Sequence, residues 1–206
     1  MRRHIVIFLA FTLMVIASGC SSDSEKSSID VKPPTSKKKD VQTEFTVNGE
    51  KFTLEKKEII DNKIEVLIPQ TFEIMSDETA KMKYPSEARP TIIYTNESGT
   101  TNVAFNYTEN EATNDQINEV KDSIKSSFKQ LYPSATWYDE KVENINGKNV
   151  AVLELLTPAI DTKIYNLIFL FELDGRLVMG TFNCIEEEKE EYEPIAKSIV
   201  KSIVVK

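Results

Sequence analysis

The sequence predicts an α+β domain with a mainly antiparallel sheet and helices covering both faces of that sheet. Two Asn-Gly pairs, at 48–49 and 146–147, stand between alternating apolar runs, which is the strongest short signal for a β-hairpin. Two segments, 117–131 and 190–203, carry apolar residues at helical spacing. The segment 162–173 is apolar on both sides of an expected strand, so both faces of the sheet need a cover.

The first forty residues differ in composition from the rest of the chain. Arg2 and Arg3 precede an apolar run from Ile5 to Ile16, which is the layout of a secretory signal and is too short to span a bilayer as a helix. Residues 21–40 are rich in Ser, Lys and Asp and have almost no apolar side chains, so we expect a disordered tether there.

The end of the signal, Ala17-Ser18-Gly19-Cys20, resembles the lipobox of bacterial lipoproteins. Such proteins are cut before the cysteine, whose sulfur then carries a diacylglycerol. The resemblance implies acyl chains such as palmitate at Cys20 and a place on the extracytoplasmic face of the cell membrane, within the cell envelope. The alternative is an ordinary cleaved signal with an incidental cysteine. We therefore predict a signal peptide over 1–19, the lipidated cysteine and tether over 20–40, and one globular domain over 41–206.

Composition excludes several classes of function. Residues 1–19 hold two of the 25 basic and none of the 33 acidic residues, so the remaining chain has a net charge of −10 and will not bind nucleic acid non-specifically. The one histidine, His4, lies in the signal, so a mature chain lacks the usual catalytic base and the commonest zinc ligand. With six glycines and no Gly-rich phosphate loop, the sequence predicts no enzyme, no cofactor and no metal.

The first half of the domain is expected to alternate strands with one short helix. A hairpin turns at 48–49, and a strand over 63–68 ends at Pro69, because proline cannot continue a ladder from a central position. Ser76 is the expected N-cap of a helix over 76–84, which Pro85 stops. Two further strands are expected over 91–95 and 102–107.

The second half is expected to contain two long helices around a run of antiparallel strands. A capping box at 113–116 precedes the helix over 117–131. Strands are expected over 136–144, 148–156, 162–173 and 176–184. In the final helix, over 190–203, Pro194 is expected to lie in the first turn, where proline is tolerated.

This order of elements resembles the PsbP-like fold, an α/β/α sandwich whose group includes bacterial lipoproteins of the LpqN and DcrB type. The residues that carry the resemblance are the strand from Ile64 through Pro69 to Phe72, the Asn-Gly turn and apolar strand over 146–156, and the helix end over 196–203. The resemblance covers about residues 60–206. It implies a fold but no catalytic residue, because members of the group differ in function.

Candidate site residues are few. Aromatic and Arg residues serve as interface anchors, so we name a partner surface of Trp137, Tyr138, Tyr84 and Arg89, with packing at the sheet edge as the alternative. The acidic run 186–191 and the cluster Glu109, Glu111 and Asp115 lack the pattern of a calcium loop and are expected to be solvated. Cys184 has acidic neighbours and no histidine nearby, so we expect a half-buried, unreactive thiol.

Three functions stay open on the sequence. The first is a non-enzymatic lipoprotein that binds or helps to assemble an envelope protein partner, and the second is a small-ligand or substrate-binding lipoprotein. The third is an enzyme that uses only carboxylates. An exposed Trp137 or Tyr84 on a flat surface favours the first, a deep apolar cavity the second, and two facing buried carboxylates the third.

Overall fold

The computed structural model describes residues 41–87 and 89–206, so the predicted signal peptide, Cys20 and the tether lie outside the described residues. In chain order the elements are β1 (Glu44–Val47), β2 (Glu50–Ile59), β3 (Ile64–Pro69), β4 (Glu73–Ile74), α1 (Asp77–Lys83), β5 (Ile92–Thr95), β6 (Asn102–Glu111), η1 (Asn114–Gln116), α2 (Ile117–Leu131), β7 (Thr136–Ile145), β8 (Lys148–Pro158), β9 (Lys163–Leu173), β10 (Arg176–Ile185), η2 (Glu186–Glu188), α3 (Lys189–Lys201) and β11 (Val204–Val205). The predicted strands and helices are all present.

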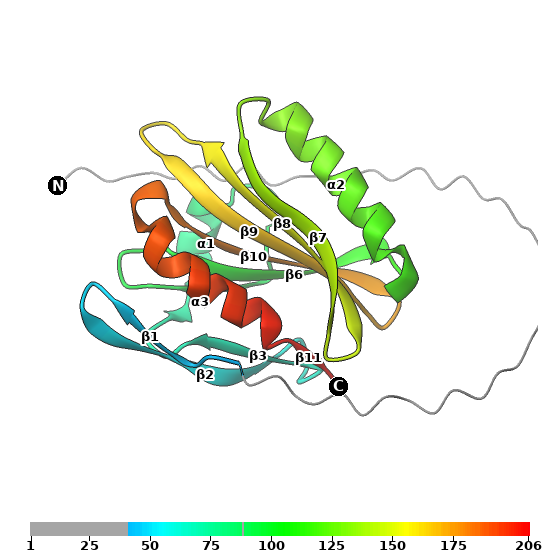
Figure 1. Cartoon of the computed structure of the whole chain (residues 1–206), viewed down its shortest axis with the longest axis horizontal. Coiled ribbons are helices and arrows are strands. Elements are labelled where there is room, and N and C mark those ends of the chain that lie inside the picture. The colour runs from blue at the N-terminus through cyan, green and yellow to red at the C-terminus, as the bar shows by residue number, and fades with distance from the viewer. Residues whose placement is uncertain (1–40, 88) are drawn as a thin grey trace, which may run out of the picture.

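The strands form two antiparallel sheets. The larger has the order β4-β5-β6-β10-β9-β8-β7, and the smaller has the order β1-β2-β3-β11. Helices α1 and α2 lie on one face of the larger sheet, while α3 and the smaller sheet lie on the other (Figure 1). This arrangement confirms the α+β, PsbP-like class with helices on both faces. The smaller sheet as a separate layer was not predicted.

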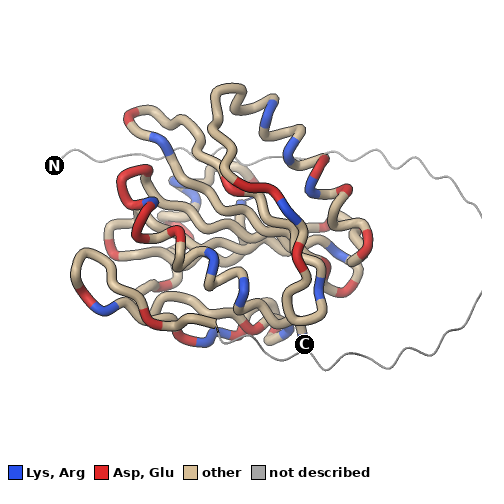
Figure 2. The backbone as a smooth tube through the Cα atoms, in the orientation of Figure 1, with Lys and Arg blue, Asp and Glu red and all other residues tan. Residues whose placement is uncertain are grey.

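The central strand β9 is buried on both faces, as its sequence predicts. Tyr165, Leu167 and Phe169 belong to the core shared with α3 and the smaller sheet, whereas Ile168 and Leu170 belong to the core under α2. Side chains of successive strand residues point to opposite faces, so one strand contributes to two separate cores. Charged residues gather on α2, α3, β7 and the smaller sheet, and the centre of the larger sheet is almost free of them (Figure 2).

Gly180 in β10 lets two aromatic rings meet across a strand. It is paired with Phe105 of β6 on one side and with Phe169 of β9 on the other. The two rings make an edge-to-face pair with centroids 5.7 Å apart. A Cβ at position 180 would lie 1.9 Å from a ring carbon of Phe169, so no side chain fits beneath this pair.

The helix ends agree with most of the predicted caps. The Ser76 side chain accepts a hydrogen bond from the Thr79 backbone N–H at the start of α1, and a capping box joins Thr113 and Gln116 before α2. On the apolar stripe of α2, Ile117 and Ile124 are buried.

The prediction that Pro194 lies in the first turn of the last helix is wrong. The helix α3 begins at Lys189, which places Pro194 in its second turn. Proline leaves the carbonyl four residues earlier, that of Glu190, without its helical donor. Both Pro194 and Glu190 are exposed, so water can hydrate that carbonyl and the helix continues.

We predict that Gly180→Ala lowers the free energy of unfolding by about 3 kcal/mol, because the added methyl group overpacks the core against Phe169. Urea unfolding monitored by circular dichroism measures the change. The neighbouring Thr181→Ala, at a partly exposed position of the same strand, is the control and should change stability by about 0.5 kcal/mol or less. Equal stability of the two variants would contradict the close packing at position 180.

Candidate partner-binding face

A β-bulge on the edge strand β7 turns one aromatic side chain outward. The register with β8 shifts between Trp137, which pairs with Leu155, and Asp139, which pairs with Glu154, so Tyr138 is the extra residue. Such bulges redirect a side chain out of the regular pleat. Tyr138 is 47% exposed, more than any other aromatic side chain in residues 41–87 and 89–206.

The first residue of α3 lies against this ring. The Lys189 Nζ is 4.5 Å from the centroid of the Tyr138 ring and 5.2 Å from that of the buried Tyr165 ring. Its ammonium also donates a hydrogen bond to the Glu193 carboxylate one helical turn later. Lys189 therefore joins the exposed tyrosine of β7 to β9 and α3 through cation–π contacts and an ion pair.

Beneath this contact lies a buried carboxylate. Glu154 lies on the same face of β8 as Val150, Val152 and Leu156, which belong to the core packed against α3. Although it is an acidic residue, its side chain is only 3% exposed. Its carboxylate pairs with the Lys197 ammonium at 3.3 Å, and Lys197 also donates to Glu193. A buried charge is costly unless it is paired, and this pair supplies the compensation.

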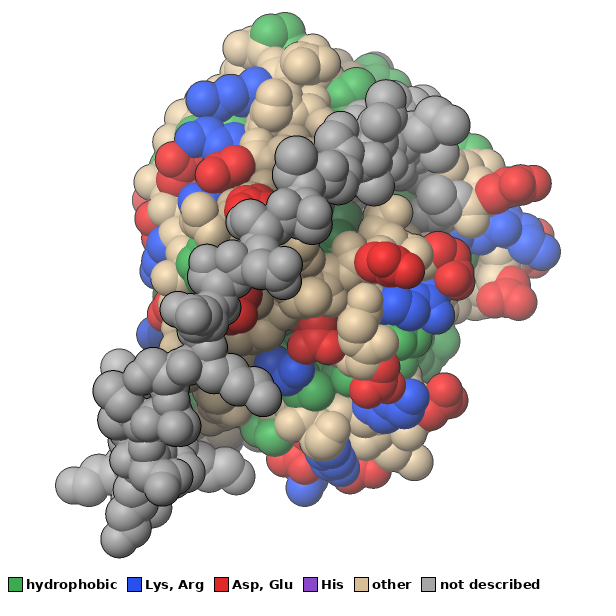
Figure 3. Space-filling model, turned by 90° about the vertical axis from the view of Figure 1, so that its right-hand side faces the viewer, with side chains coloured by type: hydrophobic (Ala, Val, Ile, Leu, Met, Phe, Trp, Pro, Cys, Tyr) green, Lys and Arg blue, Asp and Glu red, His purple; other side chains and the backbone are tan. Residues whose placement is uncertain are grey.

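Together, Tyr138, Glu154, Lys189, Glu193 and Lys197 form what we call the α3–β7 face. Two carboxylates and two ammonium groups alternate along it, so its own charges cancel. Neighbouring Asp139, Lys141 and Glu143 continue the alternation along β7, with Lys141 lying 3.1 Å from Asp139 and 3.9 Å from Glu143. The end of the molecule seen in Figure 3 likewise shows both signs of charge interspersed with small apolar areas.

The ion pairs shift the protonation of these groups. Burial lowers the pKa of Lys189, but its hydrogen bond to Glu193 and the nearby carboxylates raise it by more, so the net pKa is raised. Lys197 behaves in the same way. Burial raises the pKa of Glu193, but hydrogen bonds from Lys189 and Lys197 outweigh burial, so the net pKa is lowered. All three groups are therefore held in their charged forms near neutral pH.

Tyr165 completes the buried side of the face. Burial, followed by the charges of Glu154 and Glu193, strongly raises the pKa of its phenol, so the hydroxyl stays neutral.

The structure does not bring the four predicted surface residues together. Tyr84 is 5% exposed and packs with Met75 and Ile93 under α1, and burial raises its pKa to about 12. Its place in an exposed partner surface is therefore corrected. Arg89 is half-buried, and its guanidinium donates hydrogen bonds to the backbone carbonyls of Tyr84 and Ser86, at 3.3 and 3.1 Å. It therefore stabilises the loop in which it lies.

Trp137 and Tyr138 are neighbours in sequence but contact different layers. Trp137 is half-buried and packs against the core under α2, while Tyr138 lies against Lys189 of α3. The register shift at the bulge lies between Trp137 and Asp139, and of the two aromatic residues only Tyr138 stays mainly exposed. Glu154 was not among the predicted site residues, although a single acidic residue inside the apolar run 150–156 was a usable sequence signal.

The remaining candidates have ordinary structural roles. Cys184 is fully buried rather than half-buried, and burial raises the pKa of its thiol. In the acidic run, the Glu188 carboxylate accepts a hydrogen bond from the Thr101 hydroxyl, and the Glu191 carboxylate accepts one from the Asn48 backbone N–H. Glu109 pairs with Arg176. No group of three or more metal-ligating side chains occurs within the part of the chain that the structure describes.

We predict that Glu193→Gln lowers the free energy of unfolding near neutral pH by about 1 kcal/mol. The variant should also lose less stability than wild type as the pH falls. A carboxyl whose pKa is lowered by folding stabilises the protein above its ordinary pKa of 4.5, and that contribution is lost as pH falls through the folded value. Urea unfolding between pH 3 and pH 7 tests this, with the exposed Glu119→Gln on α2 as control. Parallel pH curves for wild type and Glu193→Gln would contradict the ion-pair assignment.

Comparisons with known proteins address the fold. No family model and no curated protein matches the sequence. Among solved structures, the chain is similar to cyanobacterial PsbP (CyanoP) from Synechocystis sp. PCC 6803, with a TM-score of 0.55, 13% identity, and coverage of 74% of this chain and 92% of that chain. It also matches LpqN of Mycobacterium tuberculosis, described as involved in cell envelope biogenesis, with a TM-score of 0.48, 9% identity, and coverage of 69% and 82%.

Another match is a Pseudomonas aeruginosa protein of unknown function, PA94, with a TM-score of 0.45, 11% identity, and coverage of 75% of this chain and 97% of that one. Within the described residues, no helix has the length and apolar character needed to cross a membrane. At these identities the similarity concerns the fold alone. The larger antiparallel sheet with helices on both faces and the match to CyanoP together establish that this chain has a PsbP-like fold.

Proposed function

We propose that the protein is a lipid-anchored, extracytoplasmic, non-enzymatic module that binds an envelope protein partner through the α3–β7 face. The observation that carries this proposal is Tyr138, a mainly exposed aromatic side chain held in place by Lys189 beneath its ring. Aromatic anchors that are already rigid lose little entropy on binding, and they dominate the energetics of many interfaces.

The setting of Tyr138 supports a protein partner. The ring is surrounded by charges of both signs, which resembles the polar rim of a protein interface around an apolar anchor. A surface with balanced charge also gives no general attraction to nucleic acid or to anionic lipid.

The N-terminal sequence supports the anchor, and the composition supports a non-enzymatic role. The Ala17–Cys20 motif follows a signal-like apolar run, and the mature chain contains no histidine. Two acyl chains on one residue hold a protein stably at a membrane, where one chain gives only reversible binding. The anchor would concentrate the domain near membrane-bound partners.

We predict that Cys20 takes up labelled palmitate in intact cells and that Cys20→Ala abolishes the labelling. Loss of the Cys20 thiol should also move the protein from the membrane fraction to the medium or the soluble envelope fraction. Cys184→Ala is the matched control, since that thiol is buried and should not affect labelling. Undiminished labelling of the Cys20→Ala protein would contradict the anchor.

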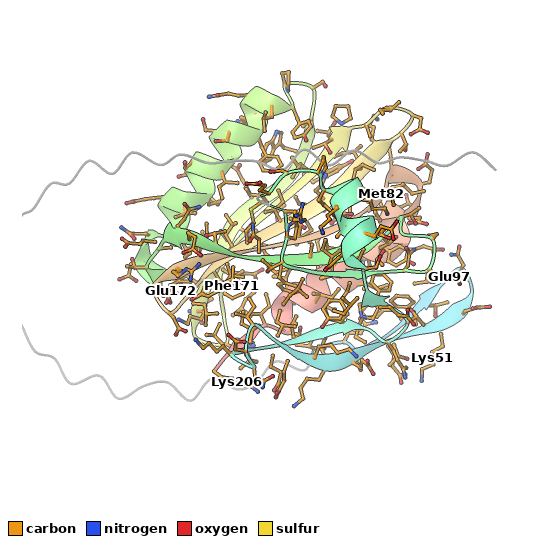
Figure 4. The ribbon with its side chains drawn as sticks, turned by 180° about the vertical axis from the view of Figure 1, so that it is seen from behind. Lys51, Met82, Glu97, Phe171, Glu172 and Lys206 are labelled. Atoms are coloured by element: carbon orange, nitrogen blue, oxygen red, sulfur yellow. The ribbon has the colours of Figure 1, made fainter. Side chains whose placement is uncertain are left out.

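We predict that a photo-crosslinking phenylalanine analogue at position 138 captures a specific envelope protein in intact cells. The control position is 82, because Met82 is 68% exposed but lies on α1, on the opposite side of the larger sheet from α3 (Figure 4). Tyr138→Ala should reduce recovery of the partner in pull-downs, whereas Met82→Ala should not. Capture of the same proteins from both positions, or of none from position 138, would contradict this docking face.

A further inference from the structure

We propose that Glu154 is a positioning residue that holds Lys189 beneath the Tyr138 ring through the chain of contacts Glu154–Lys197–Glu193–Lys189. Its consequence for partner docking rests on the proposed function above. The positioning itself is a property of the domain and can be measured without a partner.

The chain of contacts runs from the core to the surface without a break. It starts at the 3%-exposed Glu154 carboxylate and passes through Lys197, which is 39% exposed, to Glu193. It ends at Lys189, whose side chain is 19% exposed and whose ammonium lies between the rings of Tyr138 and Tyr165. Every step joins opposite charges, so each ammonium is held by a carboxylate on at least one side.

A purely structural role explains Glu154 poorly. An apolar residue at position 154 would match Val150, Val152 and Leu156 on the same face of β8, and replacing buried ion pairs by apolar residues is often neutral or stabilising. The Glu154 carboxylate differs from an apolar residue because it places a negative charge under the start of α3. That charge favours the protonated Lys189.

Without Glu154, the positions of Lys197 and Lys189 would be less firmly fixed. Lys189 and Lys197 donate hydrogen bonds to separate oxygens of Glu193, Oε2 and Oε1, so without Glu154 both ammonium groups would depend on this shared carboxylate. Lys189 would be held less strongly, and the Tyr138 ring on the bulge would lose the group that fixes its orientation. The buried residue thus controls the order of an exposed one through two intermediates.

Selective ¹³C labelling of lysine in the full chain carrying Cys20→Ala tests the positioning by NMR. The ring currents of Tyr138 and Tyr165 should shift the Lys189 ε-methylene resonance away from the value of an ordinary exposed lysine. We expect Glu154→Gln to return this resonance toward the ordinary value and to lower the pKa of Lys189. Lys197→Gln breaks the same link from the solvent side and should do likewise, so the test survives if Glu154→Gln fails to fold.

Two variants separate positioning from general stability. Lys197→Arg keeps the positive charge and should preserve the Lys189 resonance, whereas Lys197→Gln should not. A merely structural effect of position 197 would not separate these two variants according to charge. Glu143→Gln removes a carboxylate from the rim of the face but not from the chain of contacts, and it should leave Lys189 unchanged. An unaltered Lys189 resonance in both Glu154→Gln and Lys197→Gln would overturn the proposal.

Cross-linking then tests the consequence for docking. Lys197→Gln should reduce capture at position 138 by about fivefold, which corresponds to about 1 kcal/mol. If the Lys189 resonance moves but capture stays at the wild-type level, the role of Glu154 in docking is overturned. If wild type captures nothing at position 138, the proposed function fails instead, while the NMR result still decides the positioning of Lys189.

Discussion

The structure depends on one constraint, the burial of the central strands of the larger sheet on both faces. Strand β9 contributes Phe169 to one core and Ile168 to the other, so neither face can be left to solvent. Helix α2 covers one face from within the chain. The other face is covered by α3 and the smaller sheet, which come from both ends of the domain. The core on that face joins residues from Val47 in β1 to Ile203 after α3. Closing this second layer therefore unites the two ends of the described chain around one apolar core.

The α3–β7 face lies where that second cover meets the edge of the sheet. Deep in the layer, α3 contributes apolar residues such as Ile195 and Ile199. Toward β7 the contacts become ionic, with Glu154 buried and Lys197 partly exposed. The low dielectric strengthens each pairing and also makes any unpaired charge expensive. The same helix thus closes the core and orders the polar surface next to it.

The edge strand β7 is protected against unwanted pairing with other strands. Its bulge at Tyr138 interrupts the regular ladder, and Asp139, Lys141 and Glu143 present charges of both signs along one side. Bulges and charged residues are common means of preventing edge-to-edge aggregation. A partner of this face is therefore expected to bind through side chains around Tyr138 rather than by adding a strand to the sheet.

The sequence by itself determined the elements of the domain and the α+β class, because the period of its apolar residues and its turn residues are local properties. It indicated the two faces of β9 in the same way. Tertiary structure alone decided that Tyr84 is buried, that Trp137 and Tyr138 face different layers, and that the first strands form a separate sheet. It also brought Glu154 to Lys197 and Lys189, because which charge meets which depends on how α3 crosses β8 and β9, and no local pattern encodes that crossing.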